Sequence, residues 1–161
     1  MNCMIALYPP PSVAAALAVP GGEPAEELHI TLAYFEEVSS LQLMSILNAV
    51  SYWASDTESS DFNGKVNGIG EFMNGDENAL IALPDLPHLF NMRRNLLSEL
   101  NLYGVKELMS QNHGFIPHIT LKYESSPVDV PASYMKHVDL WFDSVFVVLN
   151  DSSVKYEFPL L

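Results

Sequence analysis

The chain of 161 residues has a single cysteine, Cys3, and no long apolar run. One cysteine excludes an internal disulfide and every zinc site built from several cysteines. We expect Cys3 to be a small buried residue near the first strand. The apolar stretches at residues 13–19 and 145–149 are far shorter than the roughly 18 residues of a membrane-spanning helix. The sequence therefore predicts neither a disulfide nor a membrane anchor.

Basic residues are also scarce, since 7 Lys and Arg stand against 20 Asp and Glu and give a formal net charge of −13. Proteins that bind long nucleic acids neutralise many phosphates with Lys and Arg, so we do not expect a long nucleic acid as a tight ligand. A small nucleotide is compatible with this charge, because a few hydrogen-bond donors in a cleft can hold one or two phosphates. Prolines at residues 9–11 and the lack of preceding Lys or Arg argue against a signal peptide. We expect a cytoplasmic protein without a membrane partner.

The composition, 48% hydrophobic and 17% charged, is typical of a compact globular protein. The length fits one domain over residues 1–161. Periodicity and turn residues predict a mixed α+β pattern. The expected strands are residues 4–8, 28–35, 65–72, 79–83, 116–123, 138–149 and 154–158. The expected helices are residues 13–19 with Ser12 as the cap, a helix that begins at Ser39 or Ser40 and continues to Ala54, and a helix that begins at Leu89 and ends near Gly104.

A repeated hexapeptide is the most informative feature of the sequence. Residues 29–34 read HITLAY and residues 118–123 read HITLKY, so the copies agree at five of six positions and lie 89 residues apart. Each copy falls on an expected strand. One pair of copies does not make a solenoid, and we interpret it as two related lobes that share a core.

Strand geometry assigns a face to each residue of the repeat. Side chains at positions i and i+2 share a face, so His29 lies with Thr31, and His118 with Thr120. Each lobe therefore presents an imidazole and a hydroxyl, and the two pairs converge if the lobes face each other. We expect the residues of the opposite face in the core: Ile30, Leu32 and Tyr34 in one copy, and Ile119, Leu121 and Tyr123 in the other.

Two imidazoles beside one phosphate are sufficient for phosphodiester chemistry. One neutral histidine takes a proton from the attacking hydroxyl or water, and the other, protonated, gives a proton to the leaving oxygen. The residues leave open which of His29 and His118 is the acid. Threonine hydroxyls can donate hydrogen bonds to the non-bridging oxygens. HExxH, GxSxG and Walker-type patterns are absent from the sequence.

The paired HITL motifs at residues 29–32 and 118–121 resemble the two H-x-T/S signatures of the 2H phosphoesterase superfamily. This LigT-like group includes RNA 2′,3′-cyclic phosphodiesterases and so-called 2′-5′ RNA ligases. The order of the expected elements is similar to that of the family over most of the chain. Small phage-borne members resemble the chain in size and in the segment GGEPAEELHITLAY.

The resemblance implies a bilobal fold, in which two pseudo-symmetric lobes with antiparallel sheets and outer helices flank a central cleft. It implies His29 and His118 as the acid–base pair, Thr31 and Thr120 as phosphate-holding residues, and no metal or other cofactor. We expect a monomer, located in the host cytoplasm if a phage encodes it.

Three other side chains are candidates for substrate binding. Lys122 has the strand parity of His118 and could reach an anionic substrate. Tyr8 and Phe115 could stack on a base, although either could instead pack in the core. We expect structural or surface positions for the remaining histidines and for the arginine pair: His88, His113, His137, Arg93 and Arg94.

The leading hypothesis is a metal-independent phosphodiesterase that acts on small nucleotide phosphodiesters. Its substrates would be 2′,3′-cyclic or 2′-5′ linkages, or the cyclic oligonucleotide immune signals that some phage-borne relatives cleave. The alternatives are a non-catalytic sponge for a cyclic nucleotide, RNA-end processing like that of 2′-5′ RNA ligases, and a structural protein with a relic cleft. The acidic composition argues against long RNA.

Overall fold

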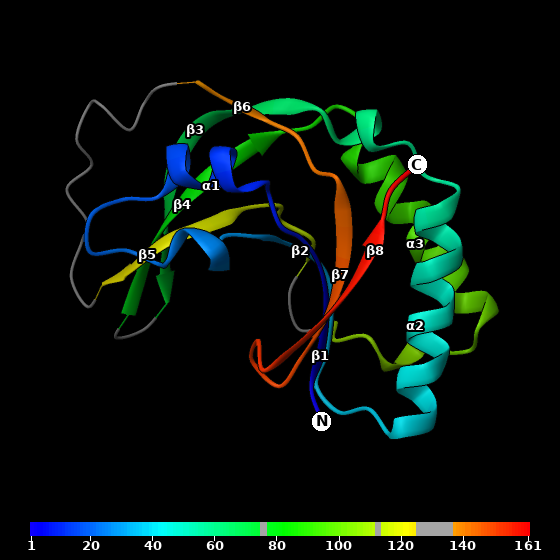
Figure 1. The fold of residues 1–161 in the computed structure, drawn as a ribbon. Helices are drawn as coiled ribbons and strands as arrows, with labels where there is room; N and C mark the ends of the chain where they lie inside the picture. The colour runs from blue at the N-terminus through cyan, green and yellow to red at the C-terminus, as the bar shows by residue number, and fades with distance from the viewer. Residues whose placement is uncertain (75–76, 112–113, 125–136) are drawn as a thin grey trace.

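A computed structural model describes residues 1–74, 77–111, 114–124 and 137–161, which form eight strands and three α-helices (Figure 1). The expected turn residues Gly75 and Asp76, His113 and most of the expected loop at 124–132 lie outside these residues. The strands are β1 (Cys3–Leu7), β2 (Ile30–Phe35), β3 (Gly64–Asn74), β4 (Glu77–Asp85), β5 (Ile119–Glu124), β6 (Val138–Leu140), β7 (Ser144–Leu149) and β8 (Val154–Pro159). The helices are α1 (Pro11–Leu17), α2 (Ser40–Ser55) and α3 (Leu89–Leu102), with short 3₁₀ helices η1 (Ala25–Glu27), η2 (Ser59–Phe62) and η3 (Lys106–Leu108).

All eight strands belong to one sheet of order β6-β3-β4-β5-β2-β1-β7-β8, in which every pairing is antiparallel. The order divides evenly at β2 and β5, the two strands that carry the repeat. We call β2-β1-β7-β8 the His29 half and β6-β3-β4-β5 the His118 half. Among the described residues, one pair of Cα partners joins the halves, Ile30 with Ile119. The α+β fold is confirmed, and the two expected sheets are joined edge to edge.

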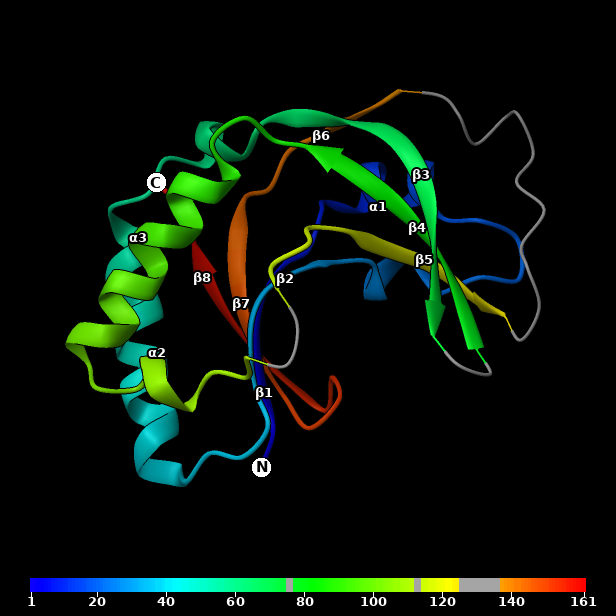
Figure 2. The same ribbon diagram turned by 180° about the vertical axis from the view of Figure 1, so that it is seen from behind.

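Helices α2 and α3 lie side by side and cover the His29 half next to β7 and β8 (Figures 1 and 2). A capping box begins α2, because the Ser39 hydroxyl accepts from the Gln42 N–H and the Gln42 side chain accepts from the Ser39 N–H. In the other half, α1 contacts η1 and β6. It begins at Pro11 and not after Ser12, since proline suits the first turn of a helix, where its missing N–H costs nothing. No helix of the described residues is long and apolar enough to cross a membrane.

The expected strand at residues 138–149 is in fact two strands in different halves. β6 pairs with β3 at one edge of the sheet, whereas β7 pairs with β1 and β8. The chain crosses between the halves at residues 141–143. Phe142 is 1% exposed, so the apolar pattern continues through the crossing and hides the break from a sequence analysis.

A β-bulge interrupts each copy of the repeat at its leucine. The pairing of β2 with β1 skips Leu32, and the pairing of β5 with β4 skips Leu121. Both leucines are buried, as expected, but a bulge turns the following side chains to the other face. Tyr34 and Tyr123 are therefore 39% and 53% exposed, and the prediction that they lie in the core is wrong. The other expected core residues of the repeat, Ile30 and Ile119, are fully buried, as is Cys3.

Candidate active site

The two His-x-Thr pairs meet where the halves join. Because Ile30 pairs with Ile119 and both point into the core, the residues on either side of each point to the opposite face. The antiparallel direction sets Thr31 on the same side of this pairing as His118, and His29 on the same side as Thr120. All four side chains of the pairs are partly exposed. The joint thus brings two imidazoles and two hydroxyls to one accessible face.

Both histidines have the same anchor. Nδ1 of His29 lies 2.7 Å from the carbonyl oxygen of Glu27, and Nδ1 of His118 lies 2.7 Å from that of Ile116. A carbonyl can only accept, so each Nδ1 carries the hydrogen and donates it. In the neutral ring Nε2 then has a free lone pair, which is the form a proton acceptor needs.

The bulged leucines are also supported in matching ways. The Leu32 carbonyl accepts from Nε of Arg93 at 2.8 Å, and the Leu121 carbonyl accepts from the backbone N–H of Glu23 at 2.8 Å. A bulge leaves its residue outside the regular ladder, so each carbonyl takes a donor from outside the strand pair. These two hydrogen bonds hold the backbone of each strand at the residue that directly follows Thr31 or Thr120.

A compact group of side chains encloses His29. The Tyr8 ring lies 5.1 Å from the imidazole and 5.1 Å from Phe146. Lys155 reaches over the Tyr8 ring at 4.4 Å and forms an ion pair with Glu27 at 3.3 Å. The last strand of the sheet therefore supplies a cation next to His29.

Burial lowers the pKa of His29, and the charges of His118 and Lys155 lower it further. The hydrogen bond and the charge of Glu27 act in the opposite direction. The effect of His118 indicates that the two imidazoles lie within electrostatic range of each other. Burial also raises the pKa of Tyr8 to about 12, so this phenol stays protonated at neutral pH.

His118 has a more open environment. Its ring meets the edge of Phe72 at 4.7 Å, and it lines a pocket of about 320 Å³. Thr31 lines the same pocket, together with Arg93 and Phe115. The pocket is therefore lined by residues from both copies of the repeat and by a guanidinium group.

The candidate substrate-binding residues have three different positions. Tyr8 lies against His29, and Phe115 lies in the pocket with His118. The Lys122 ammonium lies next to the turn at Gly21, where an added Cβ would be 3.8 Å from Nζ. Lys122 follows the bulge, so the parity argument that linked it to His118 no longer holds. Binding roles for these three residues remain predictions.

Sequence reasoning missed two basic side chains at this site, Arg93 and Lys155. Arg93 was expected on the helix surface, but its side chain crosses to β2 and lines the pocket. A signal was present, because the helical period puts Arg93 on the same stripe as the buried residues Leu89, Leu96 and Leu100. Lys155 carried no such signal, since its position depends on how β8 pairs.

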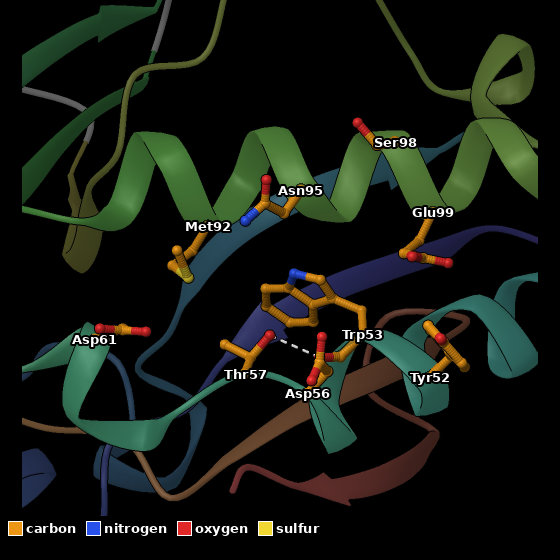
Figure 3. A pocket seen from close by; sticks show the side chains of 9 residues that line it. All are labelled: Tyr52, Trp53, Asp56, Thr57, Asp61, Met92, Asn95, Ser98 and Glu99. Atoms are coloured by element: carbon orange, nitrogen blue, oxygen red, sulfur yellow. Dashed lines mark hydrogen bonds between the residues drawn. The ribbon is translucent and has the colours of Figure 1, made fainter.

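A second pocket, of about 280 Å³, lies between α2 and α3 (Figure 3). Its lining includes the carboxylates of Asp56, Asp61 and Glu99 and the buried Trp53, but no histidine. Three carboxylates repel a phosphate, so this pocket does not suit a nucleotide. Within the described residues, no group of three or more His, Cys, Asp or Glu side chains could hold a metal ion.

Comparisons with solved structures show the same fold. The chain matches TT0787 of Thermus thermophilus with a TM-score of 0.72 and 20% identity over 99% of this chain and 98% of that one. It matches E. coli LigT in complex with 3′-AMP with a TM-score of 0.62 and 20% identity, over 99% and 95% of the chains. Usb1 of Kluyveromyces marxianus with uridine monophosphate gives 0.63 and 10%, over 99% and 97%.

A comparison with curated protein sequences finds no match. The model of one protein family, described as the 2′-5′ RNA ligase superfamily, matches residues 16–151. That range contains both His-x-Thr pairs, all four strands of the His118 half, and β2 and β7 of the His29 half. The chain therefore belongs to the 2′-5′ RNA ligase superfamily, the 2H phosphoesterases.

Proposed function

We propose that the protein is a metal-independent phosphodiesterase that cleaves small nucleotide phosphodiesters by acid–base catalysis between His29 and His118. The matched anchoring of the two histidines carries this proposal, because each backbone carbonyl leaves Nε2 free for proton transfer. Family membership supports a phosphodiesterase or RNA-processing enzyme. Two proton-transfer groups on one face favour turnover over simple binding.

The environments of the two histidines suggest different roles. The pKa of His29 is lowered by burial, so His29 is neutral over a wider pH range and suits the general base. Its Nε2 accepts a proton as the oxygen of water or of a substrate hydroxyl bonds to phosphorus. His118 donates a proton from Nε2 to the oxygen whose bond to phosphorus breaks. Thr31 and Thr120 donate hydrogen bonds to the non-bridging oxygens, where negative charge develops.

The charge of the protein and the size of the pocket favour a small substrate. A net charge of −13 repels long polyanions, whereas about 320 Å³ can hold part of a nucleotide. The solved relatives LigT and Usb1 contain 3′-AMP and uridine monophosphate, respectively. We therefore propose 2′,3′-cyclic or 2′-5′ linkages, or cyclic oligonucleotide signals, as substrates.

Mass spectrometry of a nucleotide panel incubated with the purified protein in EDTA tests the proposal. The panel contains 2′,3′-cyclic mononucleotides, 2′-5′-linked oligoadenylates, cyclic di- and trinucleotides, and a short RNA with a 3′-terminal extension. The control is the His29→Ala/His118→Ala double variant. Cleavage by the wild type alone supports the mechanism and identifies the substrate class.

Other outcomes distinguish the alternatives. Retention of an intact cyclic nucleotide without cleavage supports a sponge, and trimming of the RNA alone supports RNA-end processing. Cleavage that persists in the double variant contradicts the two-histidine mechanism.

A further inference from the structure

The guanidinium group of Arg93 is held in place by two contacts. Nε donates to the Leu32 carbonyl at 2.8 Å, and Cζ lies 4.0 Å from the ring centroid of Phe115. Phe90 in turn packs its ring against Phe115 at 5.5 Å. A planar cation that is bonded at Nε and stacked on a ring has little freedom to rotate, so the direction of its remaining donors is fixed.

The support of β2 does not require a charge at this position. The equivalent carbonyl in the other half, that of Leu121, is satisfied by the neutral backbone N–H of Glu23. A guanidinium has five N–H donors, and the Leu32 carbonyl uses the one on Nε. The support of β2 therefore leaves the positive charge and the four N–H groups of the two Nη atoms of Arg93 available to bind a ligand.

Arg93 also has no counter-ion in the described part of the chain, although the protein contains 20 acidic residues. Its side chain is partly buried, and this burial lowers its pKa. An arginine remains charged even so, and a partly desolvated cation without an anionic partner is costly. An anionic ligand in the pocket would remove that cost.

The position of Arg93 separates it from the phosphate between the histidines. Leu32 lies two residues beyond Ile30 along β2, which is roughly 6 to 7 Å at the usual rise of a strand. We propose that Arg93 forms a second anion-binding subsite, which holds a phosphate next to the one that is cleaved. This inference rests on the proposed function and narrows it to substrates with at least two phosphates, such as oligonucleotides, in preference to cyclic mononucleotides.

Three dinucleotides test the subsite: 2′-5′-linked diadenosine without a terminal phosphate, the same molecule with a 5′-phosphate, and the same molecule with a 3′-phosphate. Binding is measured by calorimetry with the His29→Ala/His118→Ala protein, so that no ligand is cleaved. The measured quantity is the ratio of Kd values without and with the terminal phosphate. Bidentate hydrogen bonds from a guanidinium to a phosphate should make this ratio about tenfold or more for one of the two phosphorylated ligands.

Three substitutions in the same background assign this gain to Arg93. Arg93→Met keeps the aliphatic stem against Phe115 and should reduce the ratio to near one. Arg93→Lys keeps the charge without the fork of donors, and should leave a smaller gain than arginine does. The control is Arg94→Met, which removes an exposed neighbouring arginine and should retain the full gain. Circular dichroism verifies that each variant is folded.

The outcomes separate the subsite from the proposed function. Equal Kd values for the three dinucleotides, including no binding of any of them, overturn the subsite, as does a full gain in both Arg93 variants. If the gain depends on Arg93 but the wild type cleaves nothing in the panel, the proposed function fails and the subsite stands. If the wild type cleaves a member of the panel but the gain in affinity does not depend on Arg93, the subsite is overturned and the proposed function stands.

Discussion

The His29 half and the His118 half support their histidines in the same way but surround them differently. In both, a backbone carbonyl two residues earlier fixes Nδ1, and a bulge follows the threonine. Around His29 the chain adds Tyr8 and Lys155, which bury the ring and place a cation beside it. Around His118 it leaves an open pocket with Arg93 on its wall.

This comparison shows that two copies of one repeat can have two different chemical environments. The backbone of the repeat determines where each imidazole lies. The side chains from neighbouring strands and helices determine how readily each imidazole is protonated and how accessible it is. An acid–base pair needs two groups whose environments favour opposite protonation states. We therefore expect the residues that surround the repeat to affect the proposed acid–base activity as much as the repeat itself does.

The largest effect is expected from removing either imidazole. His29→Ala and His118→Ala should each reduce kcat/KM by about 10²- to 10⁴-fold, because each removes one of the two proton-transfer groups. Cleavage assays in EDTA with the substrate found in the panel measure the loss. His88→Ala removes an exposed imidazole at the start of α3 and serves as the control. Full activity in either of these two variants would contradict the two-histidine mechanism.

A substitution at Gly22 should disturb the support of one half only. A Cβ there would lie 2.4 Å from the Leu121 carbonyl oxygen and 2.6 Å from Val19 Cγ2, so Gly22→Ala must push the backbone apart. Such crowding costs about 1–3 kcal/mol of the free energy of unfolding, which urea denaturation measures. At Gly114 an added Cβ meets nothing within 4 Å, so Gly114→Ala is the matched control. Equal stability of the two variants would show that the backbone around Gly22 can move to accommodate the added Cβ.

The burial of His29 makes the fold sensitive to mild acid. Its pKa is lowered from the ordinary value of 6.5, so the folded protein binds fewer protons than the unfolded chain just below that pH. Stability therefore rises with pH through this window and falls as the pH drops from 7 toward 5. His29→Gln, which cannot be protonated, should show a smaller loss of stability over this range in urea titrations at fixed pH. An unchanged pH dependence would mean that the imidazole is solvated.

The smallest effect is expected from Lys155. Its charge lowers the pKa of His29, so Lys155→Met should raise that pKa and move the acid limb of the kcat/KM profile to higher pH. NMR titration of the imidazole measures the same shift directly. Lys65→Met changes the net charge equally at an exposed position on β3 and is the control. An acid limb that moves equally in both variants would reflect net charge alone.

The sequence was sufficient for the features that depend on short-range pattern. The repeat placed Thr31 and Thr120 on strands, although β2 and β5 begin one residue after His29 and His118. Alternation put Ile30 and Ile119 in the core. The helical period and the cap at Ser39 predicted α2. In each case the signal lies within one turn or one strand, where local geometry determines which way a side chain points.

Features that depend on a partner strand were missed. The bulges at Leu32 and Leu121 exist only relative to β1 and β4, so simple alternation put Tyr34 and Tyr123 on the wrong face. Lys155 reaches His29 through the pairing of β8 with β7, which no local pattern encodes.

The pairing of β1 with β7 has a consequence for how the protein is made on the ribosome. Leu7 pairs with Val145, so β1 must wait for a strand that is synthesised much later. Contacts of such long sequence separation form late and slow folding. Until their partner strands are synthesised, nascent β1 and β2 expose apolar edges that are open to chaperones and to aggregation. The His29 half is completed only once β8, which follows β7, has also emerged from the exit tunnel.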